Sequence, residues 1–361
     1  MARKDKVRIA VVGAGFGRSF AEIYQAHPNV EYVGLCDKNE KLLNEAGDAL
    51  KIKLRHTDLD EVLAGDKYNA VHIVTPVNTH APLCCKVLLA GKHCASAVPM
   101  GMTLDELRSV IDAQRKSKMN YMMMETGVYT SEYLYAKKLY KSGELGALQL
   151  LQGTHSQDLE YAPAVWKGFP PMLYITHAIA PLLDLADTRA VKVMCLGSGV
   201  MRDELRKPYS NPYPAAMALF RLEGTSTAIE ITRTIFETSC YGGEGFAVYG
   251  SKASIVAFWP TGITLTHIGP FVPGKERHVD AKINLEPPSS KDMLPDAMKP
   301  FSEGAHSGSH PHLVHEFISS IVEKRRPYVD ATKAANWCAP GICANESARK
   351  DGDPVPVPAF I

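Results

Sequence analysis

Short apolar runs alternate with helix-patterned segments throughout residues 1–125, and no other feature of the sequence constrains the fold more strongly. The apolar runs cover 7–13, 31–37, 70–76, 92–99 and 120–126. Helical patterns lie at 17–26, 39–50, 58–65, 79–90 and 103–118, and Thr103 with Glu106 has the spacing of a capping box. Strands that alternate with helices predict a doubly wound parallel sheet, which we assign to a first domain over residues 1–125.

Residues 126–361 have a different texture, which predicts a second, α/β domain. A helix is expected near 131–142, where Gly143 would end it, and longer alternating segments then begin. Such segments are typical of a large, mostly antiparallel open sheet with one solvated face. They read ALQLLQGTH, VKVMCLGSGV, AMALFRLEG, TSTAIEITRTIF, GFAVYGSKASIVAF and GITLTHI.

A loop and two helices are expected in the last hundred residues. Residues 269–311 are rich in Pro, Gly, Ser and charge, and predict a long surface loop. A helix over 311–324 would be capped by Ser309, would accept Pro311 in its first turn, and carries an apolar stripe for its buried face. A final helix is expected near 331–348.

The composition is that of an ordinary globular protein and argues against several classes. Hydrophobic residues make up 45% of the chain and charged residues 22%, with a formal net charge of +1. This balance gives no support for a nucleic-acid partner, and no apolar run reaches the length of a membrane-spanning helix. Eight cysteines show no CxxC pair and the start of the chain lacks a secretory signal pattern, so we expect reduced thiols and a cytoplasmic location.

A glycine-rich turn follows the first apolar run, with Gly13, Gly15, Phe16 and Gly17 in the segment GAGFGR. The third glycine comes early, so the match to GxGxxG is partial. Glycine still permits a tight turn and a close backbone approach, and the start of the following helix favours a pyrophosphate. The segment therefore predicts a dinucleotide site.

Asp37 ends the second apolar run, about 20 residues beyond the glycines, where a carboxylate can accept hydrogen bonds from both ribose hydroxyls. A carboxylate there repels a 2′-phosphate, so we expect NAD(H). Lys38 leaves NADP(H) open, and the alternative role of Asp37 is a helix N-cap.

Polar residues also follow later strands at the carboxyl edge of the predicted sheet, where ligands bind in this architecture. The segment TPVNTH offers four candidate cofactor contacts, or else only a turn with Thr79 as a helix cap. These candidates are Thr75, Pro76, Asn78 and His80. Glu125 ends the last strand and could contact the nicotinamide ribose or a sugar hydroxyl, or could face solvent.

Together these motifs resemble the Gfo/Idh/MocA oxidoreductases. The resemblance rests on GAGFGR, Asp37, TPVNTH, GKHCASAVPMG and KSGELG (141–146), and covers the whole chain. It implies a Rossmann NAD-binding domain followed by an α/β domain whose open sheet carries the substrate face and commonly an oligomer contact. It further implies nicotinamide-dependent chemistry on sugars or polyols, and we expect a homodimer or homotetramer.

Two positions depart from the ordinary dehydrogenases of that family. Those enzymes carry Glu-Lys-Pro where this chain has Ala followed by Val98 and Pro99, and Val98 cannot hold a reacting hydroxyl as the lysine does. They also carry an aspartate four residues before a histidine, whereas here Leu173 precedes His177. The segment YITH (174–177) instead resembles the NAD-dependent glycoside hydrolase branch, such as the α-N-acetylgalactosaminidases, which has Tyr-Pro-Thr-His there.

That branch implies hydrolysis through a transient oxidation. C3 of the sugar is oxidised, a base removes the acidified C2 proton, the aglycone leaves from C1, water adds, and the cofactor restores C3. From the residues alone, Tyr174 and His177 are three apart and would project from one face of a helix, which Pro181 would kink. His177 suits the C3 hydroxyl proton and Tyr174 the C2 proton, or the reverse. The alternative is that both belong to a structural core patch.

Several other side chains are candidate substrate contacts. Trp166 could stack on a sugar face or belong to the core, and His310 could contact substrate ahead of a helix start. The histidines of HSGSHPHLVH lack the spacing of a metal site, so no metal is expected. An anionic sugar, such as a sulfonate or uronate, would suit four cations that could equally form a solvated face. They are Lys167, Arg202, Arg206 and Lys207.

Three functions remain open from the sequence. The first is the NAD-dependent glycoside hydrolase, favoured by Tyr174 beside His177. The second is a sugar or polyol dehydrogenase or reductase with net hydride transfer, in which His177 alone handles the proton; the absent lysine argues against it. The third is a non-catalytic cofactor-binding protein, against which Tyr174 argues.

Overall fold

The computed structural model describes residues 6–238, 243–258, 262–304 and 306–361. The chain forms two compact units. The first contains the chain up to Tyr129, then Ser290–Ala335 and Phe360–Ile361, and the second contains Thr130–Ser289 and Asn336–Ala359. This division differs from the predicted boundary at residue 125, because the chain returns to the first unit after residue 289.

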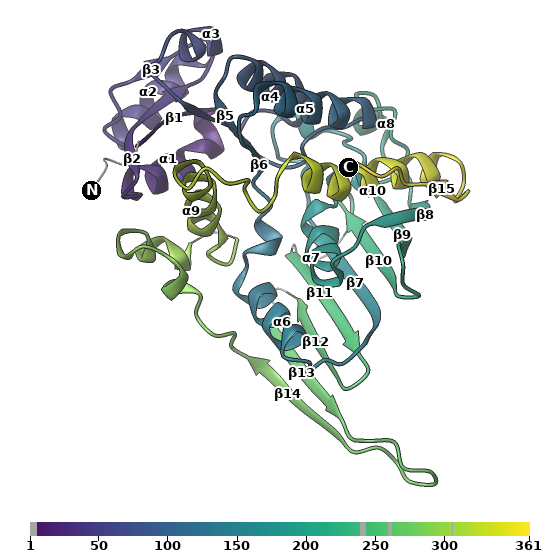
Figure 1. Ribbon diagram of the computed structural model, residues 1–361. Coiled ribbons are helices and arrows are strands. Elements are labelled where there is room, and N and C mark those ends of the chain that lie inside the picture. The colour runs from purple at the N-terminus through teal and green to yellow at the C-terminus, as the bar shows by residue number, and fades with distance from the viewer. Residues whose placement is uncertain (1–5, 239–242, 259–261, 305) are drawn as a thin grey trace. The chain divides into compact units, whose positions relative to one another are not determined.

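The first unit is built around a six-stranded parallel sheet with the order β3-β2-β1-β4-β5-β6 (Figure 1). Its strands are β1 (Val7–Val12), β2 (Val30–Cys36), β3 (Arg55–His56), β4 (Ala70–Ile73), β5 (His93–Ser96) and β6 (Tyr121–Met123). Every residue of β4 and β6 is buried, as expected where helices cover both faces of a parallel sheet. The predicted doubly wound parallel sheet is confirmed.

Helices connect these strands at the predicted places. They are α1 (Ala14–Ala26), α2 (Glu40–Ala49), α3 (Leu59–Leu63), α4 (His80–Leu89) and α5 (Leu104–Ser117), with the short helices η1 (Val77–Thr79) and η2 (Thr126–Val128). The predicted capping box of α5 is present, since the Thr103 side chain accepts from the Glu106 N–H and Glu106 accepts in return. Helix α1 begins three residues earlier than its apolar pattern suggested.

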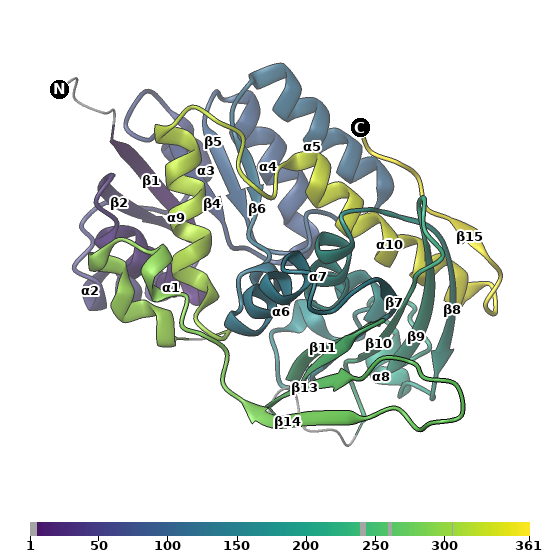
Figure 2. The same ribbon diagram turned by 60° about the horizontal axis from the view of Figure 1, so that its bottom comes forward.

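Helix α9 (Ser309–Val322) belongs to the first unit and packs against α1 (Figure 2). Its apolar stripe is buried as predicted. The predicted cap at Ser309 is wrong, because the helix starts at that residue and Gly308, with a φ of 72°, is its N-cap. The short helices η5 (Lys291–Met293) and η6 (Asp296–Glu303) precede it.

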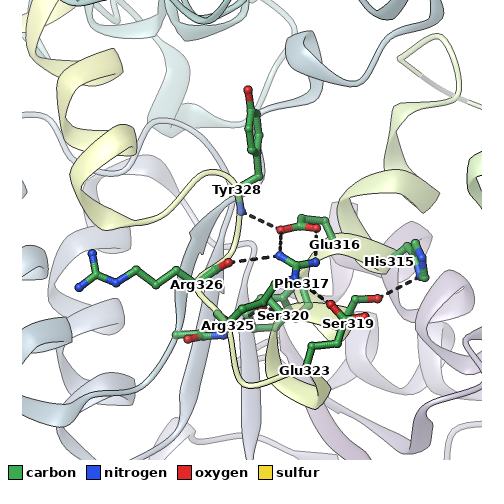
Figure 3. Close-up of polar contacts among 10 residues, drawn as sticks. His315, Glu316, Phe317, Ser319, Ser320, Glu323, Arg325, Arg326 and Tyr328 are labelled. Atoms are coloured by element: carbon green, nitrogen blue, oxygen red, sulfur yellow. Dashed lines mark hydrogen bonds and ion pairs between the residues drawn. The ribbon is translucent and has the colours of Figure 1, made fainter. Parts of the chain in front are cut away.

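A group of polar contacts fixes the turn after α9 (Figure 3). The Arg325 guanidinium donates to both carboxylate oxygens of Glu316 at 2.6 and 2.7 Å, and Glu316 also accepts from the Tyr328 N–H at 2.7 Å. The amide of Asn120, just before β6, donates to the Ser320 hydroxyl and to the Arg325 carbonyl. These contacts tie α9 to the edge of the parallel sheet.

The second unit contains a nine-stranded sheet with the order β14-β13-β12-β11-β7-β10-β9-β8-β15. Its strands are β7 (Leu148–Ser156), β8 (Ala190–Ser198), β9 (Ala215–Leu222), β10 (Ala228–Thr234), β11 (Gly243–Gly250), β12 (Ala253–Phe258), β13 (Gly262–Ile268), β14 (Val279–Leu285) and β15 (Val355–Pro356). Strands β7 and β10 pair in parallel and the other neighbours pair antiparallel, so the predicted mostly antiparallel sheet is confirmed.

The prediction of one uninterrupted loop over 269–311 is wrong. It contains β14, which pairs with β13 at the edge of the sheet, as well as η5 and η6. Six of the seven β14 residues are exposed, so an edge strand of this kind has no buried face to mark it in the sequence. Antiparallel pairing with β13 holds this strand in the sheet.

Helix α7 (Thr176–Ala186) covers β7, β10 and β11. The helix approaches closely because Gly153 has no side chain; a Cβ at that position would lie 2.5 Å from the Ala178 carbonyl oxygen. The face of β8 and β9 formed by Met194, Leu196, Met217 and Leu219 is 49–58% exposed, which agrees with one solvated face. The other helices of this unit are α6 (Ser131–Lys141), η3 (Ala164–Trp166), η4 (Pro171–Tyr174), α8 (Asp203–Arg206) and the larger part of α10 (Ala331–Arg349).

None of the helices in the described part of the chain combines the length and apolar content needed to cross a membrane. Seven cysteines lie in that part and all seven are free thiols, whereas Cys240 lies outside the described residues.

Candidate functional site

Gly13 makes the sharp turn between β1 and α1. Its φ is +102°, and a Cβ there would lie 2.2 Å from the Val74 carbonyl oxygen, so glycine is required. Helix α1 starts at Ala14 and is described along its whole length. It has neither a side-chain cap nor an acidic residue in its first turn. The N–H groups of such a helix start suit a pyrophosphate.

Asp37 lies beside this turn. One carboxylate oxygen accepts from the Ala14 N–H at 2.8 Å and the other from the Asn39 N–H at 2.8 Å. The N-cap of α2 is Asn39, whose side chain accepts from the Leu42 N–H, so the alternative role of Asp37 as a helix cap is wrong. A fixed, partly exposed carboxylate beside the glycine turn fits the ribose end of a dinucleotide.

The other residues of the glycine segment lie in the first turn of α1. A Cβ on Gly17 would lie 2.7 Å from Cγ1 of Val11, so this early third glycine lets the helix pack closely on β1. Gly15 lies in more open space, where a Cβ would meet only Leu42 at 3.7 Å. Phe16 is 53% exposed.

The TPVNTH segment divides into exposed and buried residues. Pro76 and Asn78 are exposed and Thr75 is half-buried, so these three remain open to a ligand. Thr79 occupies the N-cap position of α4, as the alternative expects, although its side chain makes no capping hydrogen bond there.

His80, in contrast, is buried and directed at protein atoms. Its Nδ1 lies 2.8 Å from the Pro99 carbonyl oxygen and its Nε2 lies 2.8 Å from the Thr75 carbonyl oxygen. Burial lowers the pKa of His80, while the two carbonyl acceptors and the carboxylate of Glu106 act in the opposite direction. His80 therefore holds the TPVNTH loop to the turn at Val98 and Pro99, whose peptide bond is cis.

Val98 and Glu125 are both buried at the carboxyl edge of this sheet. Val98 is 7% exposed. Glu125 has no exposed surface, and its Oε1 accepts from the Gly127 N–H at 2.8 Å. The alternative that Glu125 is a loop carboxylate facing solvent is wrong.

Tyr174 and His177 meet in the second unit. The Tyr174 hydroxyl lies 3.2 Å from Nε2 of His177. They do not share one helix as predicted: Tyr174 ends η4, and His177 lies in the first turn of α7 beyond Ile175. Tyr174 is half-buried and His177 is 6% exposed. The predicted pair therefore exists, although it is formed across a junction between two helical segments.

Aromatic and charged residues surround this pair. The Trp166 ring lies 5.0 Å from that of Tyr174, centroid to centroid, and Trp166 is only half-buried. His155 on β7 lies 5.6 Å from the Tyr174 ring and 5.2 Å from the His177 ring. The guanidinium of Arg233 on β10 lies 5.4 Å from the Tyr174 ring centroid. A phenol, two imidazoles and a guanidinium thus share one site.

The first unit matches a known family. Residues 7–125 match the Gfo/Idh/MocA family model, described as an oxidoreductase family with an NAD-binding Rossmann fold. The matched residues include the glycine turn, Asp37 and the TPVNTH loop. Residues 7–125 are therefore an NAD-binding Rossmann domain similar to that of the Gfo/Idh/MocA oxidoreductases.

Curated relatives extend the similarity beyond the Rossmann domain. A glycosyl hydrolase family 109 protein of Saccharopolyspora erythraea is 22% identical over 99% of this chain and 83% of its own length. A protein of the same name from Shewanella baltica is 28% identical over 50% of this chain and 44% of its own length.

Solved structures share the two-domain fold. A levoglucosan dehydrogenase in complex with NADH superposes with a TM-score of 0.79, at 19% identity, over 98% of this chain and 100% of that one. A myo-inositol 2-dehydrogenase from Lactobacillus plantarum gives a TM-score of 0.78 at 15% identity, with the same coverage. At these identities the likeness concerns the fold.

Two other predicted substrate contacts pack against or pair with protein groups. His310 belongs to the first unit, where it is 4% exposed and its ring lies 4.4 Å from that of Phe20 and 5.7 Å from that of Phe16. Arg202 pairs with Glu160 and Glu237, which makes it part of an ion-pair group. No group of three or more metal-type ligands occurs among the residues that the structure describes.

Sequence reasoning missed three residues of the site, namely His155, Arg233 and Glu244. They lie on different strands, and only the register of the sheet brings them together. The sequence signal that could have found two of them is the alternation of inward and outward residues along β7 and β10. This alternation places His155 and Arg233 at inward positions among apolar neighbours.

Proposed function

We propose that this enzyme is an NAD-dependent glycoside hydrolase that acts through a transient oxidation of its sugar. The observation that carries the proposal is the Tyr174 hydroxyl at 3.2 Å from Nε2 of His177. Two acid–base groups in contact suit a reaction that moves two different substrate protons. The names of the relatives that match over nearly the whole chain support the same class of reaction.

Bound NAD supplies the oxidation at C3 and its reversal, so that the sugar leaves with its oxidation level unchanged. The chain's own groups move the protons. His177 accepts the proton of the C3 hydroxyl at an imidazole nitrogen. The C3 ketone acidifies the neighbouring C2–H, and Tyr174, acting as the phenolate, takes up that proton at its oxygen. The C1–O bond to the aglycone then breaks as a C1–C2 double bond forms, and water adds OH to C1 and H to C2. The roles of Tyr174 and His177 are exchangeable, because each faces the other.

Val98 supports this division of labour. Its side chain can neither donate nor accept a hydrogen bond, so the position that carries a lysine in ordinary dehydrogenases of the family contributes no proton transfer. In this proposal Trp166 stacks on a sugar face, which its ring at 5.0 Å from that of Tyr174 supports.

A net dehydrogenase is the second candidate, because the solved structures with the same fold include dehydrogenases of levoglucosan and myo-inositol. One assay separates the two. The protein is given NAD+ with a panel of 4-nitrophenyl glycosides, neutral and anionic, and with the free sugars, and both nitrophenol and NADH are followed. We expect nitrophenol without accumulation of NADH. Stoichiometric NADH from a free sugar, with no nitrophenol from any glycoside, would establish the dehydrogenase instead.

A further inference from the structure

Three polar side chains form a row across neighbouring strands of the second sheet. Glu244 of β11 is the register partner of His155 of β7, and His155 is the register partner of Arg233 of β10. Directly paired residues project to the same face of a sheet. The next row on this face is Gly153, Ile231 and Phe246, which lies in the core under α7. The polar row therefore lies at the ends of these strands, next to that core.

This row contacts both members of the proposed acid–base pair. Nε of Arg233 donates to the Tyr174 carbonyl at 3.0 Å, and its guanidinium faces the Tyr174 ring at 5.4 Å. The His155 ring lies 5.2 Å from the His177 ring, and its Nε2 lies 3.5 Å from a carboxylate oxygen of Glu244. Arg233 and His155 thus contact the pair directly, and Glu244 contacts it through His155.

Arg233 is built into the unit as a fixed support. It has no exposed surface, although it carries a guanidinium. Besides Tyr174, it donates to the carbonyls of His155 and Thr234 and to Oε1 of Gln157, at 2.6–2.8 Å. One side chain therefore fixes the carbonyl of Tyr174 and the ends of β7 and β10 in a single arrangement.

Glu244 and Arg233 carry opposite charges, so they shift the pKa of a neighbouring acid–base group in opposite directions. A carboxylate favours the protonated form of a neighbouring base, and a guanidinium favours the deprotonated form. His155 and Arg233 are buried, and the Glu244 side chain is 27% exposed, so solvent screens the Arg233 charge least. Among the described residues, the titratable or charged side chains in recorded contact with the pair are His155 from β7 and Arg233 from β10, with Glu244 of β11 behind His155.

We propose that Glu244, His155 and Arg233 are positioning residues, which fix the geometry and the charge state of the Tyr174–His177 pair from beneath. This inference rests on the proposed function for the roles of Tyr174 and His177. It assigns no substrate contact to the row. It extends the site from two side chains to five and identifies Glu244 as the member whose charge can be removed with little disturbance.

The test compares Glu244→Gln with the full-length wild-type enzyme. The variant keeps the size of the side chain and removes the negative charge, so groups beside it lose protons more readily. We expect the acid limb of the kcat–pH profile to move to lower pH by less than the about 1–3 units that a charge within ~4–6 Å produces, because Glu244 acts on the pair through His155. The KM for the sugar and the affinity for NADH should stay at wild-type values.

A matched control exists on the opposite face of the same strands. Glu230 of β10 pairs across the strands with Gln152 of β7, whose amide donates to it at 2.7 Å. Glu230→Gln makes the same chemical change three residues from Arg233, so its profile should superimpose on that of the wild type. A Glu244→Gln profile that also superimposes would overturn the proposal.

Arg233→Lys provides a second variant that retains the positive charge but loses the fork of donors. We expect kcat to fall about 100-fold, the loss that follows when a reacting group is displaced by about 1 Å. The pH profile should not move, because the positive charge is retained. Unchanged kcat in a folded Arg233→Lys protein contradicts the proposal. If the wild type oxidises a sugar with net NADH and hydrolyses no glycoside, the proposed function fails, but the same profiles recorded on NADH formation still decide the role of the row.

Discussion

The hydroxyl of Tyr174 lies 3.2 Å from Nε2 of His177, across the junction between η4 and α7. The spacing of three residues would place the two side chains on one face of a continuous helix. Instead, Ile175 lies between the two segments with a φ of −109° and a ψ of 2°, and the contact forms through this irregular residue. The pair is therefore a product of the local backbone as well as of the sequence spacing.

Tyr174→Phe removes the hydroxyl and keeps the ring that packs against Trp166. We expect turnover to fall by about 10²–10⁴-fold, the range for loss of a general acid–base group. NADH affinity, measured by fluorescence titration, should not change, because the substitution leaves the turn at Gly13 and the carboxylate of Asp37 intact. Equal losses of turnover and of NADH affinity would contradict the assignment.

Asp37→Asn tests the cofactor site. Loss of the charge weakens the hydrogen bonds to the ribose hydroxyls, and such charged bonds contribute about 1.5–3 kcal/mol, so we expect NAD+ affinity to fall about 10- to 100-fold. Affinity for NADP+ should fall less or rise, because a 2′-phosphate is no longer repelled. Asp105→Asn, on a 92% exposed side chain, is the control. If both variants bind NAD+ with the same affinity, Asp37 is not part of the cofactor site.

Much of the first unit could be predicted from the sequence because its signals are local. The turn at Gly13, the carboxylate of Asp37 and the capping box of α5 each depend on residues close together in the chain. The return of residues 290–335 to that unit could not be foreseen, because helix α9 shows its apolar stripe but not the surface against which it packs.

The candidate site was predicted only in part for the same reason. Tyr174 and His177 are identified by the resemblance of the segment YITH to the glycoside hydrolase branch, whereas the row of Glu244, His155 and Arg233 is created by strand register. His80 offers a second example, since a motif predicts its presence but not that its two nitrogens face two carbonyl oxygens. Partners set by register or by loop packing leave no periodic signal in one sequence.

Glu316→Ala tests the contacts after α9. The change removes the two carboxylate oxygens that accept from Arg325, which keeps its contact with Glu323, and it removes the acceptor of the Tyr328 N–H (Figure 3). Because the Glu316 side chain is only 17% exposed, we expect the free energy of unfolding to fall by about 1–3 kcal/mol, measured by urea denaturation. Glu45→Ala breaks a solvated pair with Lys41 and should cost less than about 1 kcal/mol. Equal effects would show that the Glu316 contacts add nothing.

The contact between His27 and His315 predicts sensitivity to acid. Their ring nitrogens lie 3.0 Å apart, and burial, followed by repulsion from His315, lowers the pKa of His27 from 6.5 to about 4. Burial also lowers the pKa of His315. A histidine that binds its proton less readily when folded gives stability that is complete above the unfolded pKa. That stability is lost as the pH falls from 6.5 toward 4.

His27→Gln should flatten this dependence, because glutamine does not titrate. The measurement is the thermal unfolding midpoint of the wild type and of the variant at a series of pH values in that window. We expect the wild-type midpoint to fall more steeply with acid. Parallel curves for the two proteins would show that His27 stays neutral in the unfolded chain or protonated in the folded one.

The most direct test of the central proposal is the isotope content of the sugar released from a glycoside in deuterated water. Removal of the C2 proton, followed by addition of water, places a solvent deuteron on C2, whereas direct displacement at C1 leaves that hydrogen in place. We predict one deuterium at C2 of the product, recorded by NMR, with no net NADH and with no incorporation in the Tyr174→Phe variant. A product that retains its C2 hydrogen would contradict the oxidation and elimination route.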